Sequence, residues 1–297
     1  MVFTSSRNGQ YILHYVVLMW DYDADVSRAI YRFVCRQWRD LLPPPPQGTG
    51  TCCAGSMAAF GYLELLKWAT KMGCPLSDTD ACTEAANDGN LEILKWLREH
   101  GCPWDESAFV VAARRGNMEI LIWLRENHCP WSKKTCEFAA RSGHLNVLKW
   151  ARENGCDWDS DTCIAATEGG RLKTLKWLRK QNCPWIDTAP IAATCGNLEV
   201  LKWVKKEEIG TISWNAAVCA AAATGGHLKV LKWLRKKGCS WNADVCNEGD
   251  MEMLKWARDN GCPWDDFCGF YLAIADSWSI NGEFERLKWV NVREWMF

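Results

Sequence analysis

Residues 90–104 read NLEILKWLREHGCPW, and near copies of this stretch recur along most of the chain. In the regular middle of the chain, successive copies are separated by 28, 27, 27, 27 and 26 residues. A fixed period of this length indicates a repeat architecture, in which stacked units bury a continuous core that no unit can form alone. The tryptophans of the Leu-Lys-Trp core, or of its close variants, are Trp68, Trp96, Trp123, Trp150, Trp177, Trp203, Trp233, Trp256 and Trp289.

The unit from Trp104 to Trp131 shows how one repeat is built. Its pattern predicts a first helix that ends in Ala112-Ala113, a turn at Gly116-Asn117 and a second helix over residues 118–126, before a Cys-Pro-Trp exit. Small side chains at the alanine pair allow two helices to approach closely. The pair recurs at Ala85-Ala86, Ala139-Ala140, Ala192-Ala193 and Ala222-Ala223. A cysteine stands three residues before three of these pairs, at Cys82, Cys136 and Cys219, and Cys163 occupies the same register in another repeat.

Residues that favour helix ends occur at fixed places in the repeat. A glycine follows the second helix in several copies, where a left-handed residue is favoured, at Gly101, Gly155, Gly238 and Gly261. Polar residues that suit a helix N-cap follow the exit, at Asp105, Ser132, Asp159 and Asn242. The second helix is apolar around well over half of its circumference, so we expect it to be packed on three sides.

Composition limits the function. The chain has 297 residues and a net charge of −1, which gives no electrostatic footprint for nucleic acid or an anionic membrane. Seventeen cysteines are an odd number, and most follow the repeat register, which indicates reduced thiols in an intracellular, cytoplasmic protein. The longest N-terminal apolar run, residues 11–20, is too short to span a bilayer.

Metal and catalytic sites are not indicated. Cysteine pairs such as Cys129/Cys136 lie seven residues apart, which is not the spacing of a zinc site, and we expect them to act as small buried hydrophobes. An acidic segment from Asp157 to Glu168 imitates a calcium loop, but Thr162 stands where such a loop needs glycine. We predict no enzyme activity, metal or cofactor, and we interpret the periodic tryptophans as core packing.

The segment before the repeats carries a first resemblance. Residues 25–42, DVSRAIYRFVCRQWRDLL, have the apolar spacing of a helix, and four prolines at positions 43–46 end it. VCRQWRDLL resembles the closing signature of an F-box, a small helical module that docks onto the adaptor subunit of cullin-RING ubiquitin ligases. The resemblance implies that Val34, Cys35 and Trp38 face the adaptor or form the core of the module. The alternative is an amphipathic helix that caps the repeat array.

The repeats carry a second resemblance. Two helices per unit with Ala-Ala-x-x-Gly-Asn/His-Leu, as in the Gly-His-Leu turns at positions 143–145 and 226–228, resemble ankyrin repeats. The short period and the Trp- and Cys-rich exits resemble the arrays of large DNA viruses of protists and of some protists themselves. A viral origin would imply a role in the host cytoplasm. We therefore expect an all-α ankyrin-like solenoid of about nine repeats at residues 51–297, a linker at 43–50 and an F-box-like segment at 1–42.

Irregular copies predict local weakness. Trp241 and Trp256 are only 15 residues apart where 19 is usual, so we expect one first helix to lack a turn and its alanine pair. An insertion within residues 205–213 and an excess near residues 276–282 disturb two further copies.

Function is expected where the repeats differ. Ankyrin-like arrays bind protein targets on a concave face built by first helices and turns, which implies a protein-interaction scaffold. The leading hypothesis is a substrate receptor for a cullin-RING ligase, and the alternative is a plain binding or sequestering protein. The candidate partner-binding residues are Glu106, Phe109, Lys133, Lys134, Phe138, Asp161, Ile164, Asp187 and Ile191.

Overall fold

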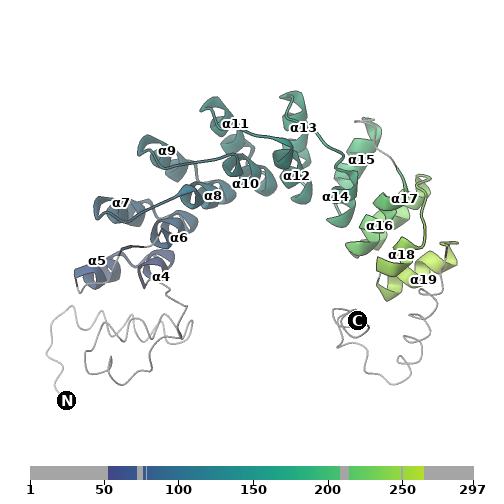
Figure 1. Cartoon of the computed structure of the whole chain (residues 1–297), viewed down its shortest axis with the longest axis horizontal. Coiled ribbons are helices and arrows are strands. Elements are labelled where there is room, and N and C mark those ends of the chain that lie inside the picture. The colour runs from purple at the N-terminus through teal and green to yellow at the C-terminus, as the bar shows by residue number, and fades with distance from the viewer. Residues whose placement is uncertain (1–52, 72–75, 78, 208–213, 249, 264–297) are drawn as a thin grey trace, which may run out of the picture. The chain divides into compact units, whose positions relative to one another are not determined.

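The computed structural model describes residues 53–71, 76–77, 79–207, 214–248 and 250–263. In this part of the chain all regular structure is helical, and helices alternate between a first and a second helix of each repeat (Figure 1). The predicted fold class, an all-α ankyrin-like solenoid, is confirmed here by eight helix pairs. The predicted ninth copy and the segments 1–42 and 43–50 lie outside the described residues.

The chain divides into two compact units at Thr162/Cys163. Unit 1 holds eight complete helices: α4 (Cys53–Ala59), α5 (Leu63–Lys71), α6 (Asp80–Asp88), α7 (Leu91–Glu99), α8 (Glu106–Arg115), α9 (Met118–Glu126), α10 (Lys134–Ser142) and α11 (Leu145–Glu153). The boundary falls within α12 (Ser160–Glu168). Unit 2 continues with α13 (Leu172–Lys180), α14 (Ala189–Thr194), α15 (Leu198–Lys206), α16 (Ala216–Thr224), α17 (Leu228–Lys236), α18 (Asp244–Glu248) and α19 (Met251–Asp259).

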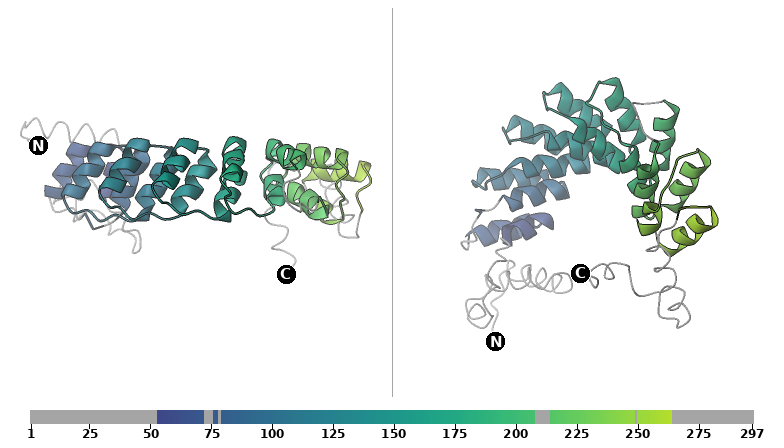
Figure 2. Two further views of the ribbon diagram at one scale, coloured as in Figure 1. Left: turned by 90° about the horizontal axis from the view of Figure 1, so that it is seen from above. Right: turned by 45° about the vertical axis from the view of Figure 1, so that its right-hand side comes forward.

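Within each unit the helices form two rows. In unit 1 the first helices α4, α6, α8 and α10 lie in one row and the second helices in the other (Figure 1; Figure 2 gives two further views). Successive first helices pack directly against each other, as α6 does on α8 and α14 does on α16. Alanine and cysteine at their contacts are small enough to allow this close approach. The second helices carry leucine and tryptophan at the equivalent places and need more room.

The ends of the helices follow the sequence closely. Helix α9 spans Met118–Glu126, as predicted, and the carboxylate of Asp105 caps α8 by accepting the amide of Ser107 at 2.8 Å. Asp159 likewise accepts the amide of Asp161 at 3.0 Å. Ser132 does not act as predicted, because Lys133 takes the N-cap position of α10 without a side-chain bond.

The exit glycines adopt the expected left-handed backbone. Their φ angles are 78° at Gly101, 82° at Gly155, 81° at Gly238 and 75° at Gly261. In two repeats other residues take this conformation, His128 at 58° and Asn182 at 53°. The sequence pattern did not identify these two positions as left-handed.

The predicted irregular copy is confirmed. Helix α18 has five residues, whereas most of the other first helices have nine. The side chain of Asp250 still caps α19, accepting the amide of Met253 at 2.8 Å, so the second helix of this repeat keeps its full length.

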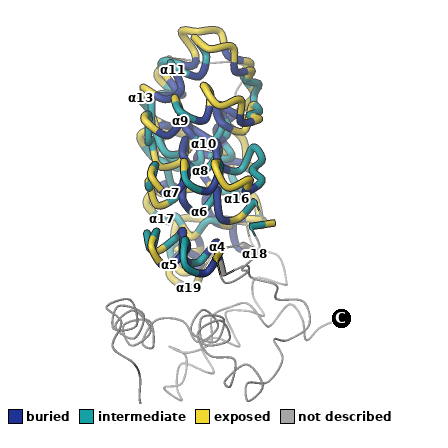
Figure 3. The backbone as a smooth tube through the Cα atoms, turned by 90° about the vertical axis from the view of Figure 1, so that its left-hand side faces the viewer, coloured by how far each residue is buried: buried dark blue, intermediate teal, exposed yellow. Residues whose placement is uncertain are grey.

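The second helices leave one side to solvent, in agreement with the predicted packing on three sides. In α7 the side chains of Ile93, Leu94 and Leu97 are fully buried, but Lys95 and the two glutamates are exposed. One side of each second helix therefore meets solvent, and exposed residues also gather at the turns (yellow in Figure 3). None of the helices in the described ranges has the length and apolar character needed to cross a bilayer.

Candidate partner-binding surface

The register of the first helix decides which residues face outward. In α10 the side chains of Cys136, Ala139 and Ala140 are fully buried between neighbouring helices. Glu137 and Phe138, which lie between the cysteine and the alanine pair, are half-buried. The first and second residues after the cysteine position are therefore the ones that the packing of a first helix leaves partly exposed.

We call these outward positions the variable stripe. In unit 1 they are acidic or polar in α6, aliphatic in α8, and acidic and aromatic in α10, whereas the buried positions on either side hardly change. In unit 2 they are aliphatic in α14 and small in α16. The half-buried members of the stripe are Thr83, Glu84, Val110, Val111, Glu137, Phe138, Ile164, Pro190, Ile191, Ala220 and Ala221.

Three of the predicted partner-binding residues belong to this stripe. Phe138 lies in unit 1, and Ile164 and Ile191 lie in unit 2. The guanidinium of Arg141 lies 6.0 Å from the centre of the Phe138 ring, so this aromatic has a cationic neighbour.

Phe109 does not belong to the exposed surface. It is fully buried, at the register that cysteine occupies in other repeats, and its ring centre lies 5.3 Å from that of Trp131. Its departure from the repeat consensus fills the core of one repeat with a larger side chain. Variation between repeats identified it as a candidate, but variation alone does not separate a surface change from a core change.

Sequence reasoning missed Val110 and Val111, the stripe residues of the same helix. Both are half-buried and apolar. Aligning the repeats on the alanine pair and taking the two positions before it would have found them, because these positions are half-buried in α6, α10, α14 and α16 as well.

The charged candidates form ion pairs between successive repeats of unit 1. The Lys134 ammonium lies 2.7 Å from the Glu106 carboxylate, which lowers the pKa of that carboxyl. Lys133 contacts both Asp159 and Asp161, the latter at 3.2 Å. Since all five side chains are at least partly exposed, these pairs align the starts of the first helices rather than contribute much stability.

The acidic groups around Lys133 have the geometry of a cation site that a lysine already occupies. Oxygens of Glu137, Asp159 and Asp161 lie within 4.8 Å of one another. The ammonium of Lys133 contacts all three carboxylates, with Glu137 at 3.9 Å. Burial raises the pKa of Glu137. The chemistry of this group is therefore that of an ion-pair network.

Asp187, the remaining candidate, is exposed in unit 2. Its carboxylate accepts the amide of Ala189 at 3.0 Å, at the start of α14. This hydrogen bond gives the residue a local structural role.

The turns between the two helices of a repeat connect it to the preceding repeat. The Nε2 atom of His144 lies 3.1 Å from the carbonyl oxygen of Arg114, and the amide of Asn197 donates to the carbonyl of Thr167 at 2.7 Å. Asn90 and Asn117, at the same register, instead cap their own second helices. Hydrogen bonds between repeats fix the spacing of the first helices and hence of the stripe.

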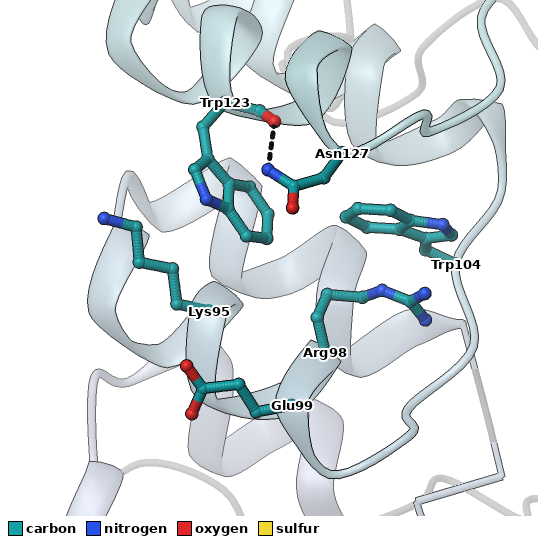
Figure 4. Close-up of a pocket in the computed structure, with 6 residues that line it drawn as sticks. All are labelled: Lys95, Arg98, Glu99, Trp104, Trp123 and Asn127. Atoms are coloured by element: carbon teal, nitrogen blue, oxygen red, sulfur yellow. Dashed lines mark hydrogen bonds between the residues drawn. The ribbon is translucent and has the colours of Figure 1, made fainter.

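The tryptophans form a ridge at the exits rather than a buried core. Each described tryptophan is half-buried. The ring centres of the exit residue Trp104 and of Trp123 lie 5.7 Å apart in an edge-on arrangement, and the guanidinium of Arg98 lies 4.0 Å from the centre of the Trp104 ring. Figure 4 shows these three side chains lining a shallow groove of about 350 Å³ together with Lys95, Glu99 and Asn127. The expectation of core packing is thus corrected to packing at the surface.

In several repeats two cysteines pair with each other, in a way that sequence spacing did not predict. The Sγ atoms of Cys246 and Cys262 lie 3.4 Å apart, and Cys82 is hydrogen-bonded to Cys102. This bond and burial raise the pKa of the Cys82 thiol, and burial raises that of Cys129 to about 12. Such thiols are protonated and shielded, as expected of small core residues.

The predicted adaptor-binding residues Val34, Cys35 and Trp38 lie outside the described residues. Of the two predicted binding surfaces, the structure therefore describes only the one on the repeats.

A protein-family model supports the repeat assignment over part of the chain. Residues 82–125, from α6 into α9, match the family model described as ankyrin repeats in many copies. No curated protein matches the chain. Among solved structures, the crystal structure of the human ASB11 ankyrin repeat domain is similar, with 18% sequence identity and a TM-score of 0.46 over 62% of this chain and 96% of that chain.

Proposed function

We propose that the chain is a non-enzymatic protein-interaction scaffold that binds a protein target through the variable stripe of its first helices. The observation that carries this proposal is the match between exposure and variation. Positions that the fold buries are nearly constant from repeat to repeat, whereas the two positions that face outward change between acidic, aliphatic and aromatic residues.

The stripe has the chemistry of a protein interface. Half-buried apolar residues such as Val111 and Phe138 can be covered by a partner, and charged residues such as Glu106 and Lys134 surround them. Protein interfaces combine an apolar, often aromatic, centre with a polar rim. The stripe residues stand on a stack of helices whose spacing is fixed by hydrogen bonds between repeats, so little ordering is needed on binding.

A single substitution in the stripe tests the proposal. We expect Phe138→Glu to remove the set of proteins that proximity labelling of the full chain identifies in its native cell. Ile122→Glu is the matched control, because Ile122 is an exposed apolar residue, 40% accessible, on a second helix of the same unit. If Phe138→Glu leaves the labelled set unchanged, or if both variants change it equally, the stripe is not the binding surface.

We further propose that the scaffold is a substrate receptor of a cullin-RING ligase in the cytoplasm. The motivating observation is the VCRQWRDLL sequence ahead of the prolines, and the twelve free cysteines of the described residues are consistent with a reducing compartment. The adaptor subunit should co-purify with the full chain but not with a Val34→Asp/Trp38→Asp variant. If the unmodified chain does not retain the adaptor, the receptor role fails, and a plain binding or sequestering protein remains.

A further inference from the structure

The second helices of the two units differ sharply in charge. In unit 1 the helices α5, α7, α9 and α11 carry seven basic and six acidic residues. In unit 2 the successive second helices α13, α15 and α17 carry eleven basic residues and a single acidic one, Glu199, whereas α19 carries two of each. The first helices α14 and α16 of the same unit have no charged residue. Among the described helices of unit 2, the positive charge therefore lies on the second helices.

Most of this charge faces solvent. The ammonium of Lys202 is paired with Glu199 at 2.7 Å, and the guanidinium of Arg235 lies 4.0 Å over the ring of Trp241. No ion pair is found among the described residues for Lys173, Lys176, Lys180, Lys206, Lys229 and Lys236, all of which are exposed. A concentration of like charge destabilises a fold by self-repulsion, so a bound anion would relieve it.

The lysines stand in two parallel columns. Lys176, Lys202 and Lys232 share the fifth position of their helices, and Lys180, Lys206 and Lys236 share the ninth. Positions four residues apart lie on the same side of a helix, so the two columns form one surface, which we call the basic face.

The helix dipole does not explain the second column. Cations stabilise the C-terminal end of a helix, which would account for Lys180, Lys206 and Lys236. In unit 1, however, the same ninth position holds Glu99, Glu126 and Glu153 in three successive second helices. The fold therefore accepts either charge here, and the lysines of unit 2 need another explanation.

A hollow at the edge of the basic face offers room for an acidic side chain. It has a volume of about 450 Å³ and lies at the start of α17, where Lys229 and Lys232 line it together with His227. One carboxylate, that of Glu252, also lines it. Backbone amides of a helix N-terminus and two lysines favour an anion.

The geometry favours an acidic polypeptide over other polyanions. Neighbouring packed helices lie about 8–10 Å apart, and an extended peptide in the polyproline II conformation advances about 9 Å per turn of three residues, which places every third side chain on the same side. Acidic side chains at every third position of a peptide would thus meet successive members of a lysine column. The chain as a whole is slightly acidic, so a long nucleic acid that extended past the basic face would meet an acidic excess.

Other surfaces of the region argue against nucleic acid and lipid. The exit tryptophans Trp214 and Trp241 already have a cation over the ring and a second-helix tryptophan at the edge, which leaves them poorly suited to base stacking. The exposed large hydrophobic residues of the described chain are Phe60, Ile122 and Ile186, and none lies on α13, α15 or α17. The basic face therefore offers no apolar anchor for a membrane.

We propose that the basic face of α13, α15 and α17 is a second binding surface, and that it takes an extended protein segment with acidic residues at about every third position. This surface lies on the second helices and is separate from the variable stripe of the first helices. It therefore goes beyond the proposed scaffold function, and either surface can fail without the other.

Fluorescence anisotropy of the full chain with a labelled twelve-residue peptide, glutamate at every third position among glycine and serine, tests this proposal. We expect binding that weakens as salt is raised. The triple variant Lys180→Glu/Lys206→Glu/Lys236→Glu should weaken binding by about tenfold or more. These substitutions restore the residue found at the same position in unit 1, so the fold should accept them, as circular dichroism would verify.

The matched control reverses three lysines in unit 1. Lys67→Glu/Lys95→Glu/Lys149→Glu changes the net charge of the chain by the same amount and should alter affinity by less than about twofold. Equal losses in both triple variants would show a general charge effect and overturn the proposal. Tighter binding of a twenty-base-pair DNA or of phosphatidylserine vesicles than of the peptide would also overturn it.

Discussion

The two rows of helices differ in the residues that they bury and in the residues that they expose. The first helices bury small residues, Cys and Ala, and expose two positions whose chemistry changes from repeat to repeat. The second helices bury the same branched residues in nearly every copy and differ mainly in surface charge. Recurrence therefore identifies the packing of the array, and the stretch that is most obvious in the sequence is the least informative about a partner.

The largest effect is expected in the second row. Leu94→Ala removes a fully buried side chain of α7 and should lower the free energy of unfolding by about 2–5 kcal/mol. Val111→Ala, in the variable stripe of the first row, should cost less than about 1 kcal/mol because the side chain is half-exposed. Urea unfolding followed by circular dichroism measures both. Equal losses would remove the distinction between the rows.

Close packing of the first row predicts a second effect. In α16, Ala222 is fully buried and the adjacent Ala221 is half-exposed. Ala222→Leu should destabilise the chain by about 1–3 kcal/mol, because the neighbouring first helix leaves no room for a larger side chain. Ala221→Leu, one residue away, should change the stability little. A tolerated leucine at 222 would show that the first helices are not held at close distance.

The contacts between repeats can be tested at the turns. A Cβ atom added at Gly116 would lie 2.5 Å from the Nδ1 atom of His144, and the backbone there has a φ of 77°. Gly101 has a similar φ of 78° but open space around it. Gly116→Ala should therefore cost about 1 kcal/mol more than Gly101→Ala, for which only the left-handed backbone is strained. Similar losses would mean that the histidine moves aside freely.

Periodicity predicted the helices because the same pattern of residues recurs in each repeat, so each copy supports the assignment of the others. The bounds of α9 and the shortened α18 followed from residue spacing alone. The orientation of single residues was harder to predict. Phe109 varies between repeats but is buried, because the cysteine register can accept a ring when the exit Trp131 stacks against it. Only the packed neighbours decide that outcome.

The net charge of the chain did not predict the basic face, for a related physical reason. A value of −1 over the chain averages two units whose second helices differ strongly, so it excluded a charged surface that is present locally. The tryptophans were likewise assigned to the core because they are periodic. A half-buried ridge of tryptophans has the same period as a buried row, so the sequence does not distinguish a ridge from a core. The arginine and the second tryptophan that pack against an exit ring are brought to it by the fold, as Arg98 and Trp123 are to Trp104.

A smaller effect of opposite sign is expected at the exits of the second row. His128 has a φ of 58° at a position where other repeats have glycine, so His128→Gly should stabilise the chain by about 0.5–1 kcal/mol. Asn182→Gly, with a φ of 53°, should gain less because asparagine tolerates this conformation better. Thermal unfolding of the two variants gives the order directly. A destabilised His128→Gly would mean that the imidazole makes a contact worth more than the strain.

The smallest effect concerns a buried hydroxyl in the first row. Thr135 is fully buried in α10, and its Oγ1 has no hydrogen-bond partner among the described residues, while Val218 and Val245 occupy the same register elsewhere. Thr135→Val should be neutral or stabilise the chain by about 0.5 kcal/mol, because an unpaired polar group is replaced by an apolar one of the same shape. Thr167→Val is the control, since that hydroxyl donates to the carbonyl of Cys163 at 2.8 Å and its loss should cost about 0.5–1 kcal/mol. If Thr135→Val lowers the stability more than Thr167→Val, the hydroxyl of Thr135 makes a stabilising polar contact. The core of the first row would then depend on a polar residue in α10, and its contrast with the variable surface would be weaker.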